Sequence, residues 1–381
     1  MDELNYKKGI ASVLRTSEDN IFLYWKGRIA LYAMLKAIGV KEGDEVILPA
    51  FTCVVVPNAI LYSGAKPVYV DIDPVTYNSV PLKVKEAVTT KTKVIICQNT
   101  FGLSSNLEEI IETARQKNIF TIEDCTHGFG GQYKGKPNGT NCDAAFYSTQ
   151  WNKPFSTGIG GFLLVNNPLL MEKIRKLEMA KLEPDLMDSL IINSLIYFKK
   201  YFVNDYTQDK LTALFRFLSR HNLVIGSSQG EELTEVQIPD KYFKGISSSQ
   251  IKHGIKQLKH LNELNSLRKK NAQDYTRFLK ANGKTFVPEV LFPDHLFLKY
   301  PLLVKQRDKF FNFARKDKVN LGDWFLSPLH PVKENLKQWG FEAEYFPTAV
   351  SISKKILNLP TDIKDNWRII SFLSKHLDFI E

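Results

Sequence analysis

The chain has 381 residues, of which 44% are hydrophobic and 24% charged, and Lys plus Arg exceed Asp plus Glu by 10. This composition is typical of a globular protein and excludes extensive disorder, and the length favours two domains. The positive excess favours an anionic partner. Because the basic residues form no dense block, and no zinc-finger or RNP-like motif occurs, we expect a small anionic molecule and not nucleic acid.

The cysteines and the N-terminus bear on the compartment. None of Cys53, Cys97, Cys125 and Cys142 forms a CxxC pair, which favours reduced, buried thiols. Residues 1–10 lack the apolar core of a signal peptide, and no run of about 18 apolar residues predicts a membrane span. We therefore expect a cytoplasmic protein.

Helical and strand patterns alternate over residues 28–125. The periodicity predicts helices at 28–38, 57–63, 81–87 and 107–117, and strands at 46–48, 68–72, 93–97 and 119–122. This alternation is typical of βαβ units and predicts an α/β fold with a mostly parallel central sheet flanked by helices. In such sheets, ligands bind at the carboxyl ends of the strands.

The segments that follow differ in character. Strands are expected at 144–148 and 162–165, with a glycine-rich turn at 158–161 between them. Residues 186–220 are rich in apolar, aromatic and basic side chains and predict one or two amphipathic helices. Such helices form a dimer interface or a domain cap, or alternatively lie on a membrane surface.

The C-terminal part predicts a second, smaller α+β domain. Residues 226–249 resemble a polar linker, residues 249–281 a single long helix, and residues 299–304 a strand. The resulting division is a large domain over 1–240 and a small domain over 241–381.

Chemistry-bearing residues gather in two stretches of the large domain. Asp124 ends a predicted strand and His127 follows three residues later, while Ser148 precedes Lys153 by five residues. Pyridoxal 5′-phosphate (PLP) needs an amine for its aldehyde, a buried carboxylate for its ring nitrogen and a donor at the ring edge. Lys153, Asp124 and His127 supply these groups.

The phosphate of such a cofactor needs hydroxyl groups and backbone N–H groups, preferably at a helix N-terminus. Ser148 supplies a hydroxyl, and the turn Gly27-Arg28-Ile29 immediately precedes or opens a predicted helix. These residues are therefore the candidates for the phosphate end of the site.

An ordered series of segments gives the chain a family resemblance. It resembles the DegT/DnrJ/StrS-type sugar aminotransferases, which are PLP enzymes of fold type I, from about Gly27 to Leu373. The segments that carry this resemblance are 43–73, 122–148, 152–167, 327–332 and 346–360.

The resemblance implies a role for each candidate. Lys153 is the Schiff-base lysine, Asp124 the partner of the pyridine nitrogen, His127 the ring-edge contact and Ser148 the phosphate-binding serine, with Gly27-Arg28-Ile29 as the phosphate-binding turn. It also implies a homodimer with sites at the subunit interface, glutamate as amino donor, and a keto-sugar acceptor linked to a nucleotide. The expected pathway is the synthesis of amino sugars for polysaccharide.

Three positions depart from the family pattern. Arg28 stands where Thr or Ser is usual, and its guanidinium is expected to bind phosphate instead. Cys53 stands where an aromatic residue stacks on the cofactor ring. Phe243 lies where a polar residue reaching from the neighbouring subunit is expected.

Each candidate also has a purely structural interpretation. Asp124 is compatible with a helix N-cap, His127 with a core histidine, Ser148 with a strand end and Arg28 with a helix-surface charge. Cys53 fits a small apolar filler better than a nucleophile. His330, in the sequence SPLHPV, either faces the substrate or stabilises its loop.

Two other functions stay open at this point. One is a PLP-dependent sugar dehydratase on the same fold, a subgroup in which histidine replaces the lysine, so Lys153 argues against it. The other is a non-catalytic sensor or binding protein, for which the changes at Cys53 and Phe243 leave room.

Overall fold

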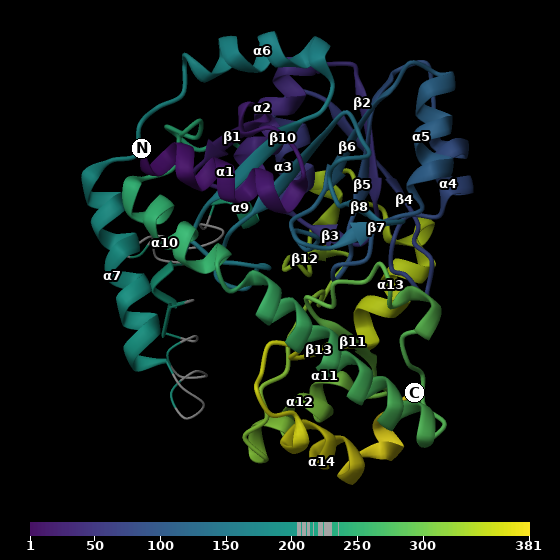
Figure 1. Cartoon of the computed structure of the whole chain (residues 1–381). Coiled ribbons are helices and arrows are strands. Elements are labelled where there is room, and N and C mark those ends of the chain that lie inside the picture. The colour runs from purple at the N-terminus through teal and green to yellow at the C-terminus, as the bar shows by residue number, and fades with distance from the viewer. Residues whose placement is uncertain are drawn as a thin grey trace.

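The structure is a computed structural model, and it describes residues 1–203, 207, 211, 214, 215, 217–219, 224, 231–234 and 236–381. Figure 1 shows the N-terminal elements, purple to teal, around a central sheet, with α11 (Leu261–Ala281), α12 (Arg307–Lys316) and α14 (Trp367–Lys375) of the green and yellow C-terminal part below it. Among the described residues, no helix is long and apolar enough to cross a membrane.

A seven-stranded sheet forms the centre of the molecule, in the order β1-β10-β9-β6-β5-β2-β4. Its strands are β1 (Ile21–Tyr24), β2 (Glu45–Pro49), β4 (Lys66–Val70), β5 (Thr92–Gln98), β6 (Phe120–Asp124), β9 (Ala144–Ser148) and β10 (Gly161–Val165). The strands from β9 to β4 pair in parallel, whereas β10 pairs antiparallel with both β1 and β9. The predicted mostly parallel sheet is confirmed.

Helices cover both faces of this sheet. They are α1 (Asp2–Leu14), α2 (Gly27–Ile38), α3 (Val55–Tyr62), α4 (Pro81–Ala87), α5 (Leu107–Gln116) and α6 (Pro168–Glu178). Alternate residues of β2 serve the two faces: Val46 and Leu48 pack in one cluster with α2 and α3, and Ile47 packs in another with α4 and α5. Burial on both faces explains why the parallel strands have near-continuous apolar sequences.

The C-terminal elements surround a hydrophobic cluster of their own. The antiparallel strands β11 (Tyr300–Leu303) and β13 (Ile356–Leu359) pack with α11, α12 and α14. Helix α13 (Pro347–Lys355) precedes β13. The domain boundary at residue 241 stays a prediction.

Short elements complete the fold. The two-residue strand β3 (Thr52–Cys53) pairs in parallel with β12 (Leu329–His330), and β7 (Gln132–Tyr133) pairs with β8 (Lys136–Pro137). The 3-10 helices are η1 (Glu18–Asn20), η2 (Glu289–Leu291), η3 (Leu336–Trp339), η4 (Ala343–Tyr345) and η5 (Leu377–Phe379).

The predicted single helix over 249–281 is wrong. The structure has α10 (Ser248–Leu258) and α11, separated at Lys259 and His260. Ser247 and Gln250 form a capping box that starts α10, and Gly254 lies against Tyr6 of α1. Helix α10 packs on α1, whereas most of α11 packs in the C-terminal cluster. One straight helix could not make both sets of contacts.

The region between residues 186 and 249 is described in part. Helix α7 (Leu186–Phe202) confirms an amphipathic helix at its start, and most of the predicted helical stretch beyond residue 203 lies outside the described residues. The predicted linker contains a short helix, α9 (Glu231–Thr234), whose Glu232 is 2% exposed. A solvated linker is therefore wrong at this position, because the Glu232 side chain is held inside the protein by buried cations.

Candidate active site

Two neighbouring strand ends bring the predicted acid and amine together. Asp124 ends β6 and Ser148 ends β9, and these strands pair in parallel with Asp124 opposite Phe146. Their carboxyl ends therefore meet at the same edge of the sheet. Lys153 lies in the turn that follows β9, so the sheet topology places it beside Asp124.

The Asp124 carboxyl group is buried, with 3% of the residue exposed. Its Oδ1 accepts a hydrogen bond from the Thr126 backbone N–H at 3.0 Å. Burial raises the pKa of Asp124, while the Thr126 hydrogen bonds and the Lys153 charge oppose this rise. The structure thus places a buried carboxylate within electrostatic reach of the lysine.

The Lys153 amine is held in an environment that disfavours its charge. Burial lowers its pKa to about 8, although Cys53 and Asp124 act in the opposite direction. The Nζ atom lies 4.7 Å from the centroid of the Trp324 ring. An amine with a lowered pKa has a substantial neutral fraction near neutrality and is a stronger nucleophile.

The His127 ring is buried between aromatic neighbours and is neutral. It stacks on Trp324 with ring centroids 4.7 Å apart and planes at 5°. Its Nδ1 accepts a hydrogen bond from the Phe101 backbone N–H at 3.3 Å, which assigns the ring proton to Nε2. Burial and the nearby charges of Lys153 and Lys299 hold the pKa of His127 well below its usual range.

The predicted phosphate end is tightly assembled. Helix α2 begins at Gly27, and a Cβ atom there would lie 2.7 Å from the Tyr147 carbonyl oxygen and 3.1 Å from Ser148 Cβ. Ile29, two residues further along α2, packs in the core. The structure thus brings the turn at residues 27–29 against Ser148, which is more than a hundred residues away in the sequence.

The Arg28 side chain does not lie on the helix surface. Its Nη1 forms a buried ion pair with Glu232 Oε1 at 2.5 Å, and Lys26 Nζ lies 3.6 Å from Glu232 Oε2. Burial acts to lower the pKa of Arg28, but Glu232 together with Tyr242 and Cys53 raises it above its ordinary value. The interpretation of Arg28 as a solvated surface charge is therefore wrong.

Cys53 and His330 are brought together from distant parts of the chain. They are paired residues of the short ladder between β3 and β12. Desolvation of the half-buried Cys53 thiol raises its pKa, although Arg28 and Lys153 act to lower it. His330 Nδ1 accepts a hydrogen bond from the Leu326 backbone N–H at 3.2 Å, which supports a contribution to the structure of its loop.

Phe243 packs within its own chain, with its ring centroid 5.8 Å from that of Tyr24. Its backbone carbonyl accepts a hydrogen bond from the Leu182 N–H at 2.9 Å. These contacts give the side chain a place in the core around β1.

Several residues at the site escaped the sequence analysis. They are Lys26, Lys199, Glu232, Lys299 and Trp324. Lys199 Nζ donates a hydrogen bond to the Trp151 carbonyl at 3.3 Å, two residues before Lys153. Lys26 directly precedes the predicted phosphate-binding turn, and its position there was the signal that could have identified it. No motif or spacing indicates the other four, because each comes from an element far away in the chain.

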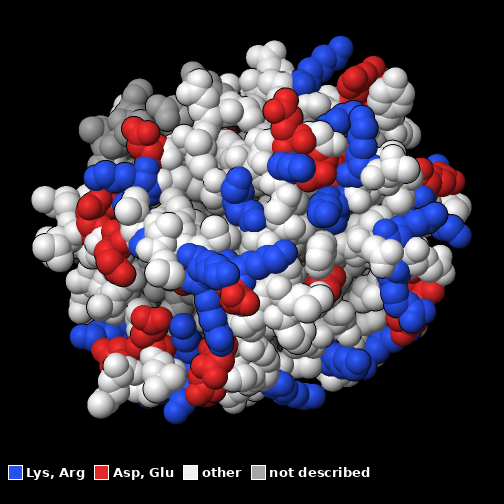
Figure 2. All heavy atoms as spheres, turned by 90° about the horizontal axis from the view of Figure 1, so that it is seen from above, with Lys and Arg blue, Asp and Glu red and all other residues white. Residues whose placement is uncertain are grey.

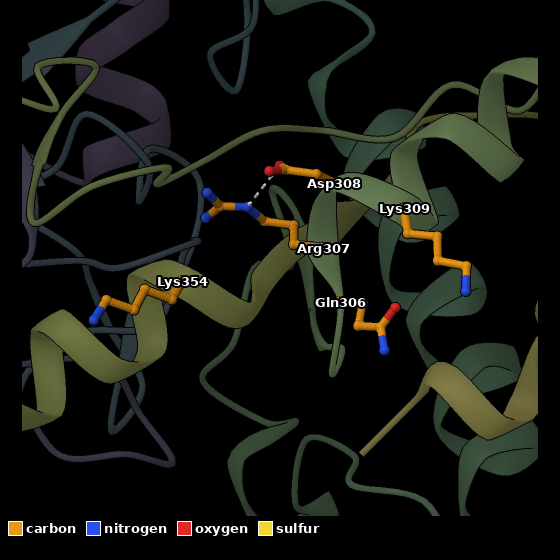
Figure 3. Close-up of a pocket in the computed structure, with 5 residues that line it drawn as sticks. All are labelled: Gln306, Arg307, Asp308, Lys309 and Lys354. Atoms are coloured by element: carbon orange, nitrogen blue, oxygen red, sulfur yellow. Dashed lines mark ion pairs between the residues drawn. The ribbon is translucent and has the colours of Figure 1, made fainter.

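A separate surface hollow lies between α12 and α13, as Figure 3 shows. Its volume is about 240 Å³, and it is lined by Gln306, Arg307, Asp308, Lys309 and Lys354. Arg307 Nε and Asp308 Oδ1 point toward one another at 4.0 Å, whereas Lys354 points away (Figure 3). None of the predicted site residues lines this hollow.

A buried carboxylate and an amine of lowered pKa at the carboxyl edge of a mostly parallel sheet are features of an α/β enzyme that acts on a carbonyl group. The model of the DegT/DnrJ/EryC1/StrS aminotransferase family matches residues 26–188 and 245–364. This chain belongs to that family. The predicted family, fold class, PLP cofactor and aminotransferase class are confirmed.

Among curated proteins, a GDP-perosamine synthase of Escherichia coli O157:H7 is 41% identical over 147 residues, which cover 39% of this chain and 40% of that protein. A pleiotropic regulatory protein of Geobacillus stearothermophilus is 30% identical over 340 residues, covering 88% and 77% of the two chains. The first of these matches thus spans less than half of the relative's length.

Solved structures share the fold. DesV of S. venezuelae, in complex with a ketimine intermediate, aligns with a TM-score of 0.74 at 18% identity, covering 100% of this chain and 90% of that one. NtdA of Bacillus subtilis, with bound cofactor PMP, aligns with a TM-score of 0.71 at 22% identity, covering 99% and 77%.

Proposed function

We propose that this aminotransferase moves an amino group from glutamate to the carbonyl carbon of a keto-sugar carried on a nucleotide. The observation that carries this proposal is the placement of the buried Asp124 carboxylate at the end of β6, beside the turn after β9 that holds Lys153. The nature of the acceptor is supported by relatives, among them a UDP-2-acetamido-2-deoxy-3-oxo-D-glucuronate aminotransferase of Pseudomonas aeruginosa, 40% identical over 152 residues. The product would serve the synthesis of amino sugars for polysaccharide.

The side chains at the site suit PLP. When bound, PLP supplies an aldehyde that bonds to an amine and a ring that withdraws electrons from the amino carbon. Lys153 would hold it covalently, and Asp124 would face its ring nitrogen. Gly27, Arg28, Ile29 and Ser148 would hold its phosphate.

Lys153 would also move the proton of the reaction. A pKa of about 8 leaves its Nζ able to accept a proton from the substrate carbon and to return it near neutral pH. Cys53 and the nearby Asp124 carboxylate favour the ammonium form and offset part of the effect of burial. The same Nζ atom therefore serves as base and as acid.

His127 would orient the ring. Because its Nδ1 accepts from the Phe101 N–H, its Nε2–H is available as a donor for an oxygen at the ring edge. Stacking on Trp324 fixes the plane of the imidazole. Cys53 would lie near the ring as a small, buried contact, and His330, its ladder partner, would line the substrate side.

Positive charge around the site supports an anionic substrate. The charge of Lys299 lowers the pKa of both His127 and Lys153, so this positive charge lies close to the proposed cofactor site. On the molecular surface, Lys and Arg are interspersed with Asp and Glu on the face that Figure 2 shows, and do not form a single block. We infer that the net charge of +10 favours a nucleotide-linked sugar over nucleic acid.

We further propose a cytoplasmic homodimer. The four cysteines are free thiols, in agreement with a reducing compartment. Helix α7 exposes large apolar and aromatic side chains, and its Lys199 contacts the turn that carries Lys153. A partner subunit packed on α7 would therefore lie close to the site.

A spectroscopic half-reaction tests the proposed function. Purified protein should absorb in the near-visible, glutamate should abolish this band, and the correct keto-sugar nucleotide should restore it. Borohydride should fix the cofactor to a peptide that contains Lys153, as peptide mass spectrometry would detect. Lys153→Ala should lose the band and the adduct, whereas Lys176→Ala, on exposed α6, should keep both.

Other outcomes identify the rivals. A Lys153→Ala protein that retains the band and an adduct elsewhere would refute the assignment of Lys153. A wild-type protein with the band but without any response to glutamate or keto-sugars would favour the non-catalytic sensor. Release of water from the sugar without amino transfer would favour the dehydratase.

A further inference from the structure

A buried cluster of three charges lies beside the N-terminus of α2. Arg28 and Glu232 form an ion pair at 2.5 Å with both side chains 3% exposed, and Lys26 Nζ lies 3.6 Å from the other Glu232 oxygen. One carboxylate is thus shared between two cations, which leaves the cluster with a net positive charge.

The Glu232 carboxylate reaches this cluster from a part of the chain that the family model leaves unmatched, residues 189–244. Two hydrogen bonds hold the short helix α9 in place. Asn58 Nδ2 donates to the Glu232 backbone carbonyl at 2.8 Å, and Trp339 Nε1 donates to Asn58 Oδ1 at 2.5 Å. The contact therefore comes from a segment that lies outside the two stretches matched by the family model.

The two cations border the rest of the proposed cofactor site. Lys26 and Arg28 flank Gly27, which lies against Ser148, and the Arg28 charge acts on both Cys53 and Lys153. A phosphate group that contacts Ser148 and the N-terminus of α2 would lie where these cations are closest. The Glu232 carboxylate is an anion already held on these two cations.

We propose that Glu232 is an internal competitor of the cofactor phosphate, held on Lys26 and Arg28 and displaced when PLP binds. Two anions that share the same cations repel each other, so the carboxylate and the phosphate cannot both keep full contact. The inference rests on the proposed assignment of Arg28 to the phosphate end. The proposal predicts that the affinity for PLP depends on Glu232, in the segment that the family model leaves unmatched, as well as on the residues that hold the phosphate.

The consequence is a weakened apparent affinity. If the carboxylate occupies the cations nine-tenths of the time, the apparent dissociation constant of PLP is raised about tenfold. Burial, opposed by Glu232, lowers the pKa of Lys26 to about 8, so removal of the carboxylate lowers this pKa further and leaves Arg28 as a buried cation without the Glu232 charge beside it. The phosphate of PLP would then supply the opposite charge.

The test compares PLP with pyridoxal, which has the aldehyde and ring but no phosphate. The full-length protein, freed of PLP by dialysis with cysteine, is titrated with each compound and followed by absorbance. In Glu232→Gln the dissociation constant of PLP should fall about tenfold, while that of pyridoxal should stay within about twofold. Inorganic phosphate should also compete more strongly with PLP in the variant.

Asp317→Asn is the matched control. Asp317 pairs with Lys375 at 3.3 Å, so this variant also removes one carboxylate from a lysine contact, but in the C-terminal part of the fold, away from the three-charge cluster. Its affinity for PLP should equal that of the wild type. A Glu232→Gln protein that binds PLP no more tightly, or gains equally for pyridoxal, would overturn the inference while leaving the Lys153 result intact.

A measurement on the unmodified protein covers the case in which Glu232→Gln does not fold. Hydrogen exchange of a peptide that contains residues 231–234 should become faster when PLP is added, because displacement of the carboxylate frees α9 from the cations. Slower exchange in this peptide on addition of PLP would mean that phosphate and Glu232 are held together, and the inference would fail.

Discussion

Lys153 and Asp124 each change the protonation of the other. Burial disfavours the charge of both groups, lowering the pKa of Lys153 to about 8 and raising that of Asp124, whereas their mutual attraction favours both charges. The pair therefore keeps an amine that can lose its proton beside a carboxylate that can remain ionised. These are the two states that the proposed reaction needs.

Removal of the Asp124 charge tests this balance. In Asp124→Asn, the attraction that favours the Lys153 ammonium is lost, so the pKa of Lys153 should fall below its value of about 8. In protein freed of PLP, labelling of Lys153 by an amine-reactive reagent, followed by peptide mass spectrometry, should reach half-maximum at a lower pH. Transamination should slow by at least about a hundredfold.

Glu86→Gln serves as the comparison, because Glu86 forms an exposed pair with Lys83. Its labelling profile and its transamination rate should match those of the wild type. An Asp124→Asn profile that does not move, or that moves to higher pH, would contradict the electrostatic contact inferred between the two groups.

At the scale of elements, the N-terminus of α2 is placed by glycine. A Cβ atom on Gly27 would meet the Tyr147 carbonyl oxygen at 2.7 Å, and one on Gly161 would meet Gly27 N even more closely. The close approach of α2 to β9 and β10 therefore requires the absence of side chains at both positions. This approach is what brings Arg28 and Ser148 to one place.

Gly27→Ala should push α2 away from β9. We expect an unfolding free energy lower by about 1–3 kcal/mol, from the strain of a methyl group without room, measured by urea denaturation of the protein freed of PLP. Gly245→Ala is the comparison, because the nearest atom to its added Cβ lies 3.4 Å away, an ordinary contact. Equal stabilities of the two variants would contradict the proposed packing requirement.

Helix α7 has one side packed in the core and another side of exposed apolar residues. Ile192 is fully buried in the main core, while Leu186, Met187 and Leu190 on the same helix are exposed. Its turns around Ile192 and Ile196 lie over the loop at Gly158, close to Lys153. One side of α7 thus closes the loop that carries the amine, and another side is left for a partner.

At the scale of the whole molecule, the proposed homodimer makes α7 an interface. Leu190→Asp places a charge on that face and should convert the dimer to a monomer, measured by light scattering after size exclusion. Leu82→Asp on α4 is the matched control, because both leucines are 61% exposed and Figure 1 places α4 on the side of the sheet away from α7. A Leu190→Asp protein of unchanged mass would show that the partner binds elsewhere.

Amino-acid order alone was sufficient to predict the sheet. Apolar runs of strand length, separated by helical periodicity, predict βαβ units because burial on both faces demands them. A carboxylate at the end of such a strand is expected at the ligand-binding edge, which is why the sequence predicts Asp124 as a site residue. Lys153 is predicted from its position after the next strand of that edge, together with the family resemblance.

Only the tertiary structure decided what surrounds this pair. Glu232 reaches Arg28 across 204 residues, and Trp324 reaches His127 across a comparable stretch of chain. Neither contact follows a local period, because each depends on how separate elements dock and not on the pattern within any of them. The break between α10 and α11 could not be predicted for the same reason. The apolar positions continue through both helices, and only the tertiary structure shows that α10 packs on α1 whereas most of α11 packs in the C-terminal cluster.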